Sequence, residues 1–176
     1  MFDDRDAEIL SILQSHGRTS NAEIARRMGM APSAILERIR KLEAKGAIRA
    51  YEARLDPQAI GLGLTAFAFV TALEPVNEMN SGAALTEIPE IQEVHYIAGE
   101  DCYLVKIRVA DSEALGRLIR EKIGTIPGMH RTRTTIVLTT LKETSGLSLE
   151  SLTGRSPGKR AGPQGARSRI RYDARR

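Results

Sequence analysis

Hydrophobic residues recur with helical spacing in the first third of the chain, separated by polar residues that fall on the opposite side. Within residues 5–15 the isoleucines and leucines share one face of a helix. A second helix is predicted to begin after Ser20, because Ser20 and Glu23 have the spacing of a capping box, and to end at Gly29. A third begins at Pro32, a residue favoured at the first helical position. Two short helices joined by a turn of about four residues, after a supporting helix, are typical of a helix-turn-helix.

The stretch that follows, residues 47–55, alternates partly between apolar and polar residues, so we expect strand character there. It would serve either as a wing beside the helix-turn-helix or as a link to a second domain. Gly61 and Gly63 then mark a hinge. We therefore assign residues 1–60 to a DNA-binding domain of the winged helix-turn-helix type.

The second half of the chain alternates between strand-like and helix-like patterns. The expected elements are strand 64–73, helix 75–88, strand 91–98, strand 102–109, helix 112–123 and strand 130–142. This βαββαβ order predicts a ferredoxin-like α+β domain over residues 61–147, with helices on one face of an antiparallel sheet. Apolar residues of one strand alternate between the two faces: Leu104, Val105, Ile107 and Val109. The uncovered face is therefore expected to be a dimer interface.

Charge is distributed unevenly along the chain. Lys and Arg number ten against eight acidic residues in residues 1–55, eight against thirteen in residues 56–152, and eight against one in residues 153–176. The last segment is rich in Arg, Gly, Ser and Pro and has few apolar residues, so we expect disorder from about residue 148 onward. Its positive charge is expected either to contact DNA phosphates without regard to sequence or to act only as a solubilising tail.

Composition narrows the class of protein further. Hydrophobic residues make up 41% of the chain and aromatic residues 4%, with no Trp, so the core must be aliphatic. The single cysteine, Cys102, excludes an internal disulfide, and no stretch has the length and hydrophobicity of a membrane span. The N-terminus lacks the pattern of a signal peptide. A cytoplasmic protein is the simplest interpretation.

The third predicted helix has the two faces that a recognition helix needs. Ile35, Ile39 and Leu42 fall on one side and pack inward. Polar residues fall on the other side, with short side chains near the N-terminus for base edges and basic residues for guanine edges or phosphates. Glu37 suits this surface only if it accepts from a cytosine or pairs with Arg40 or Lys41. The candidate DNA-binding residues are Arg18, Ser20, Ser33, Ala34, Glu37, Arg38, Arg40 and Lys41.

Several motifs resemble the Lrp/AsnC family of transcriptional regulators across residues 1 to about 144. In the N-terminal half these are the stretches over residues 6–10, 17–25 and 31–39, then Gly46-Ala47-Ile48, Tyr51, Leu55-Asp56-Pro57 and Gly61. In the C-terminal half they are the stretches over residues 98–106 and 131–138. The chain departs from the family at Cys102, where an acidic residue often precedes the aromatic, and at Ala31, where Ser or Thr usually caps the helix.

The resemblance implies a function for both halves. Members of the family dimerise through the C-terminal sheets, often assemble into octamers, bind pseudo-palindromic double-stranded DNA, and in many cases sense amino acids at the interface between dimers. The effector-binding positions that the resemblance implies are Tyr96, Ala98, Gly99, Glu100, Asp101, Gly124 and Thr134. Glu100 or Asp101 would hold an α-ammonium group, and backbone N–H groups around Gly99 would hold a carboxylate.

Other classes of function are less well supported by the residues. Cys102 lies near Asp101 and His95, but a lone cysteine at the start of a strand is usually a packed residue rather than a nucleophile. The three histidines lack metal-ligand spacing, and no phosphate loop or dinucleotide motif is present in the sequence. We therefore expect no enzyme activity, no cofactor and no metal. Two alternatives stay open: an effector-independent architectural DNA-binding protein, and a small-molecule-binding oligomer without operator specificity.

Overall fold

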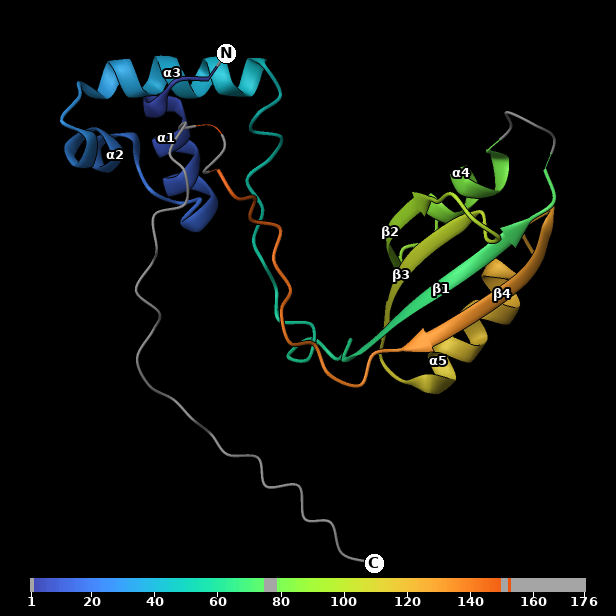
Figure 1. Cartoon of the computed structure of the whole chain (residues 1–176). Helices are drawn as coiled ribbons and strands as arrows, with labels where there is room; N and C mark the ends of the chain where they lie inside the picture. The colour runs from blue at the N-terminus through green and yellow to red at the C-terminus, as the bar shows by residue number, and fades with distance from the viewer. Residues whose placement is uncertain (1, 75–78, 150–151, 153–176) are drawn as a thin grey trace, which may run out of the picture. The chain divides into compact units, whose positions relative to one another are not determined.

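The computed structural model describes residues 2–74, 79–149 and 152. Contacts divide the chain into two compact units (Figure 1). The N-terminal unit is Met1–Glu52 together with Thr144–Arg176, and the C-terminal unit is Ala53–Glu143. Most of the basic segment expected to be disordered, residues 153–176, lies outside the described residues.

Three helices form the N-terminal unit: α1 (Asp4–Ser15), α2 (Asn21–Met28) and α3 (Pro32–Ala44). Each contributes apolar side chains to one small core, whose members are Ile9, Leu13, Ile24, Ala25, Met28, Ile35, Ile39 and Leu42. The spacing of these residues is the helical period that predicted the three elements. The predicted helix-turn-helix is confirmed.

Local chemistry explains where each helix begins. A complete capping box stands at the start of α1, where the Asp3 side chain accepts from the Asp6 N–H and the Asp6 side chain accepts from the Asp3 N–H. Ser20 caps α2 by accepting from the Glu23 N–H. Ala31 caps α3 with no side-chain hydrogen bond, as its methyl group dictates. The turn before α3 depends on Gly29, whose φ of 63° lies in the left-handed region.

The strand expected over residues 47–55 is not formed, so that prediction is wrong. These residues run as irregular chain, with Tyr51 and Leu55 exposed. A strand needs a neighbouring strand to satisfy its backbone groups, and the described residues of the N-terminal unit offer none. Partial alternation in the sequence is not enough to form a strand where no neighbouring strand is available.

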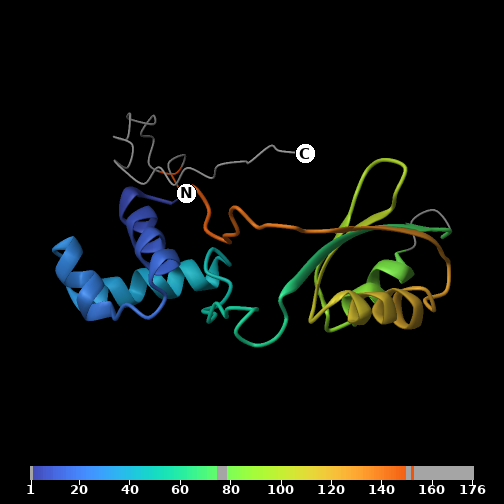
Figure 2. The same cartoon turned by 90° about the horizontal axis from the view of Figure 1, so that it is seen from below.

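The C-terminal unit is a four-stranded antiparallel sheet with helices on one face. Its elements are β1 (Leu64–Ala72), α4 (Asn80–Thr86), β2 (Ile91–Tyr96), β3 (Tyr103–Val109), α5 (Ser112–Arg117), η1 (Leu118–Ile123) and β4 (Met129–Ile136). The strand order is β2-β3-β1-β4, so the predicted βαββαβ topology is confirmed. Figure 2 shows α4 and the helix formed by α5 and η1 on the same side of the sheet.

Two strands end at least two residues earlier than the sequence predicted. β4 ends at Ile136 rather than at residue 142, and β2 ends at Tyr96 rather than at residue 98. β4 stops because β1, the strand beside it in the described sheet, begins at Leu64; beyond Ile136 the Val137 N–H still donates to the Thr65 carbonyl. The first residues of the helix predicted from Pro75 lie outside the described residues, and α4 ends at Thr86.

Alternation along β1 and β3 separates a core face from an open face. The core face carries small and branched residues that pack under the helices: Ala66, Ala68, Val70, Val105, Ile107 and Val109. The open face carries half-buried Phe67, Phe69 and Leu104 together with charged residues such as Lys106 and Arg133. Three of the four apolar residues named for β3 therefore pack into the core, and only Leu104 faces the other way.

Candidate DNA-binding surface and effector turn

Helix α3 presents one polar face beside its buried apolar face. Ser33, Glu37, Arg40 and Lys41 are exposed, whereas Ile35 is fully buried. This is the separation that the sequence predicted, and it leaves short side chains near the N-terminus of the helix and longer charged side chains further along. Arg40 forms no ion pair with any residue that the structure describes.

Glu37 is neutralised within the same face. Its carboxylate accepts from the Lys41 ammonium at 2.6 Å, one helical turn away. This hydrogen bond lowers the pKa of Glu37 below its ordinary value. Glu37 was expected to suit a DNA-facing surface only if it accepted from a cytosine or paired with Arg40 or Lys41, and it pairs with Lys41.

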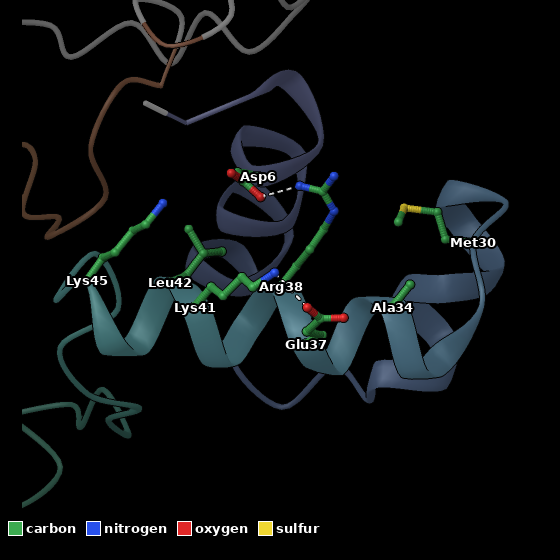
Figure 3. Close-up of a pocket in the computed structure, with 8 residues that line it drawn as sticks. All are labelled: Asp6, Met30, Ala34, Glu37, Arg38, Lys41, Leu42 and Lys45. Atoms are coloured by element: carbon green, nitrogen blue, oxygen red, sulfur yellow. Dashed lines mark hydrogen bonds and ion pairs between the residues drawn. The ribbon is translucent and has the colours of Figure 1, made fainter.

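Arg38 crosses from α3 to the start of α1. Its Nη1 atom lies 2.8 Å from Asp3 Oδ2 and 2.7 Å from Asp6 Oδ1, and Figure 3 shows the contact with Asp6. Hydrogen bonds to Asp3 and Asp6 raise the pKa of Arg38. The hydrogen bond from the Asp6 N–H, followed by that from Arg38, lowers the pKa of Asp3. The guanidinium therefore belongs to an ion-pair network inside the N-terminal unit.

A groove of about 320 Å³ runs along this side of α3 (Figure 3). The residues that line it are Asp6, Met30, Ala34, Glu37, Arg38, Lys41, Leu42 and Lys45. It contains four of the eight candidate DNA-binding residues. The sequence did not single out Asp3 and Asp6 as partners of Arg38, although their three-residue spacing is itself a capping signal.

The two candidates outside α3 lie just before α2. Arg18 is exposed in the loop before the helix. The Ser20 hydroxyl oxygen accepts from the Glu23 N–H at 3.2 Å, which leaves its proton available as a donor. Glu23 does not complete the predicted capping box, because its carboxylate accepts from Arg27 and Arg26. These hydrogen bonds lower the pKa of Glu23.

In the C-terminal unit, the turn between β2 and β3 carries most of the candidate effector residues. Gly99 has a φ of 138°, a conformation that side-chain-bearing residues rarely adopt. Ala98, Gly99 and Glu100 are exposed at the tip. Tyr96 precedes the turn, with its ring 5.5 Å from that of Tyr103 in an edge-on arrangement. This places an exposed carboxylate beside exposed backbone groups.

Asp101 is engaged differently from Glu100. Its Oδ1 atom accepts from the Thr71 hydroxyl at 3.1 Å, and its Oδ2 atom lies 3.2 Å from an Arg133 nitrogen. The Arg133 guanidinium in turn lies 4.2 Å from the centre of the Phe69 ring. Asp101 therefore connects the turn to β1 and β4, whereas Glu100 makes no ion pair with the described residues.

The last two candidates lie on other segments than the turn. Thr134 is paired with Ala68 across β4 and β1, and it points away from the face that carries its neighbour Arg133. Gly124 follows η1. A second groove of about 320 Å³, beside Leu62 and Leu118, contains none of the seven candidates. None of the seven positions lines either of these two grooves.

The base of the turn is fixed by a buried tyrosine. The Tyr103 hydroxyl donates to Glu74 at 3.1 Å, and Glu74 also accepts from the Ser81 N–H. Hydrogen bonds from Ser81, with a smaller contribution from Tyr103, lower the pKa of Glu74, and burial followed by the contact with Glu74 raises the pKa of Tyr103. Cys102 donates from Sγ to the Ala72 carbonyl at 3.4 Å, which accounts for this residue as a packed thiol.

Comparison with known proteins matches both units. A winged helix-turn-helix DNA-binding family model covers residues 2–49, and an Lrp/AsnC ligand binding domain model covers residues 65–147. Leucine-responsive regulatory proteins of Salmonella typhimurium and Escherichia coli K12 are 37% and 36% identical over 150 residues, which is 83% of this chain and 90% of theirs. The chain belongs to the Lrp/AsnC family of transcriptional regulators. The predicted resemblance and the predicted fold are confirmed.

Solved structures of family members are similar over most of the chain. A Neisseria meningitidis regulator in complex with L-methionine gives a TM-score of 0.80 at 29% identity and covers 86% of this chain and 99% of that one. Escherichia coli AsnC gives 0.77 at 26% identity, with 82% and 97% covered. A Mycobacterium tuberculosis feast or famine regulatory protein complexed with L-methionine gives 0.76 at 35% identity, with 82% and 97% covered. As an Lrp/AsnC regulator, the chain combines a winged helix-turn-helix DNA-binding domain with a ligand binding domain.

Membrane-spanning helices and metal sites are considered only for the described part of the chain. No helix there has the length and hydrophobicity to cross a membrane. No group of three or more His, Cys, Asp or Glu side chains within it is arranged to hold a metal ion.

Proposed function

We propose that α3 is the recognition helix and that its exposed face enters the major groove of the operator. Ser33 and Ala34 lie at the N-terminal end, where short side chains approach base edges, and Arg40 and Lys41 follow one to two turns later. The observation that carries this proposal is the exposure of Arg40 opposite the buried Ile35 and Ile39. Arg18 and Ser20, at the start of α2, would contact the phosphate backbone.

The test is competition between specific and random DNA. We expect the full chain to bind DNA from upstream of its own gene more tightly than a random duplex of the same length, measured by fluorescence anisotropy at one salt concentration. Equal affinity for both duplexes would favour the architectural alternative. If the chain binds neither duplex, the result would favour the other alternative, a small-molecule-binding oligomer without operator specificity.

We propose further that the turn over residues 98–101 binds the α-ammonium and α-carboxylate groups of an amino acid. Glu100 is the available carboxylate, because Asp101 is already held by Thr71 and Arg133. The exposed backbone at Gly99 would hold the carboxylate of the effector. Tyr96 adjoins this turn, but Gly124 and Thr134 lie on other segments of the chain, so the complete site would need a second copy.

Assembly follows from the same argument. The open face of the sheet carries half-buried Phe67, Phe69 and Leu104, and we propose that it forms the homodimer interface. Effector turns from different dimers would then meet in a larger oligomer. The chain would act in the cytoplasm as a regulator and not as an enzyme.

The effector proposal is tested by thermal shift against the common amino acids, with L-methionine included because two structural relatives bind it. We expect at least one amino acid to raise the melting temperature. Glu100→Gln should abolish that shift. Asp101→Asn should lower the melting temperature of the free protein while a shift remains, and a shift that survives Glu100→Gln would contradict the assignment.

A further inference from the structure

Arg38 occupies an ambiguous place on α3. It flanks the exposed face and carries a positive charge, which suggests a phosphate contact, yet its side chain is only 31% exposed and is directed toward α1. Arg38 Nη1 donates to both carboxylates, and moving the guanidinium to DNA would leave both carboxylates without that partner. The geometry therefore favours a role inside the N-terminal unit.

The carboxylates that hold Arg38 are themselves fixed. Asp3 Oδ1 accepts from the Asp6 N–H at 2.8 Å, and Asp6 Oδ2 accepts from the Asp3 N–H at 3.3 Å. Each carboxylate thus serves both the cap of α1 and the ion pair with α3. Because the Asp6 side chain is only 13% exposed, its pair with Arg38 is shielded from water more than a surface pair.

We propose that Arg38 is a positioning residue, held by Asp3 and Asp6, that fixes the recognition helix on α1 rather than contacting DNA. This assignment rests on the proposed role of α3 in DNA reading. If Arg38 has this role, the acidic residues Asp3 and Asp6 are needed for binding DNA, although DNA is itself negatively charged. Their removal would misplace Arg40 and Lys41 relative to the rest of the unit.

The proposal predicts an effect of unexpected sign. Asp6→Asn removes a negative charge, so simple electrostatics, or a freed Arg38 that contacts DNA, would strengthen binding. Positioning predicts the opposite, a loss of about fivefold in affinity for upstream DNA. Asp4→Asn is the matched control, because it removes the same charge from the first turn of α1 while Asp4 makes no ion pair with Arg38.

The salt dependence of binding gives an independent readout. Loss of one phosphate contact reduces the slope of log K against log salt by about 0.9. Arg38→Gln should weaken DNA binding without changing the slope of log K against log salt. The double variant Asp6→Asn/Arg38→Gln should bind DNA at least as tightly as whichever single variant binds less tightly. Circular dichroism at the assay temperature must show each variant folded, and Arg38→Lys should recover part of the affinity.

Three results would overturn the proposal. These are unchanged or tighter binding by folded Asp6→Asn, a reduced salt slope in Arg38→Gln, or additive losses in the double variant. Arg40→Ala tests the recognition-helix assignment separately. If α3 is not the recognition helix, this variant should bind upstream DNA with normal affinity, whatever the Asp6 and Arg38 variants do.

Discussion

The backbone of Gly82 in α4 lies directly against the ring of Tyr103 in β3, and a Cβ atom at residue 82 would be 2.6 Å from Tyr103 Cε1. Both residues are buried, so neither has room to move away. This contact sets how closely α4 approaches the start of β3, next to the turn that carries Glu100. It makes the lack of a side chain at residue 82 a packing requirement.

Gly82→Ala is therefore expected to destabilise the protein by about 1–3 kcal/mol through overpacking, despite the better helix propensity of alanine. Thermal or urea unfolding measures the effect. Gly116→Ala in α5 is the control, because a Cβ there would meet only the end of the flexible Arg120 side chain at 3.2 Å. The control should be neutral or stabilising. Equal stability of the two variants would contradict the packing argument.

Glu74 is expected to make the stability of the C-terminal unit depend on pH. Its pKa is lower in the folded protein than its ordinary value of 4.5, so the ionised carboxylate stabilises the fold at neutral pH. That contribution is lost as the pH falls from 4.5 toward the lower folded-state pKa. In denaturant unfolding, the stability difference between the natural chain and Glu74→Gln should therefore shrink below pH 4.5. Glu121→Gln, at an exposed position, is the control for loss of one carboxylate, and a gap that widens in acid would refute the assignment.

Arg40→Ala should weaken binding to upstream DNA by about 5- to 100-fold, the range for loss of one good base or phosphate contact, without lowering the melting temperature. The reason is that Arg40 is exposed on α3 and has no ion pair within the described residues. Arg117→Ala changes the net charge equally in α5 and should leave DNA affinity near normal. The measurement is an anisotropy titration of both variants at the same ionic strength.

Removal of residues 153–176 should reduce the salt slope of DNA binding while the preference for upstream DNA over random DNA persists. This segment carries eight basic residues and one acidic residue. It follows shortly after Leu147 in the sequence, whose backbone exchanges two hydrogen bonds with the Gln14 side chain of α1. A full-length chain with the eight basic residues changed to glutamine controls for length. An unchanged slope would show that the segment is only a solubilising tail.

Much of this protein could be predicted from local patterns. The helical spacing of isoleucines and leucines, the cap at Ser20 and the glycine turn at Gly29 defined the helix-turn-helix, because each depends on residues close in sequence. Strand alternation gave the βαββαβ order for the same reason. The strand expected over residues 47–55 failed because strand formation depends on a partner that no local pattern specifies.

Only the tertiary structure decided which charged residues are engaged. Arg38 and Arg40 are both basic residues of α3, yet Arg38 lies against Asp3 and Asp6 from 35 and 32 residues earlier and Arg40 does not. Likewise Asp101 meets Thr71 and Arg133, while the adjacent Glu100 stays exposed. The sequence by itself determined the helices, the sheet order and the family. Long-range packing decided which side chains are left to meet DNA or an effector, because electrostatic partners are chosen by distance in space and not by order along the chain.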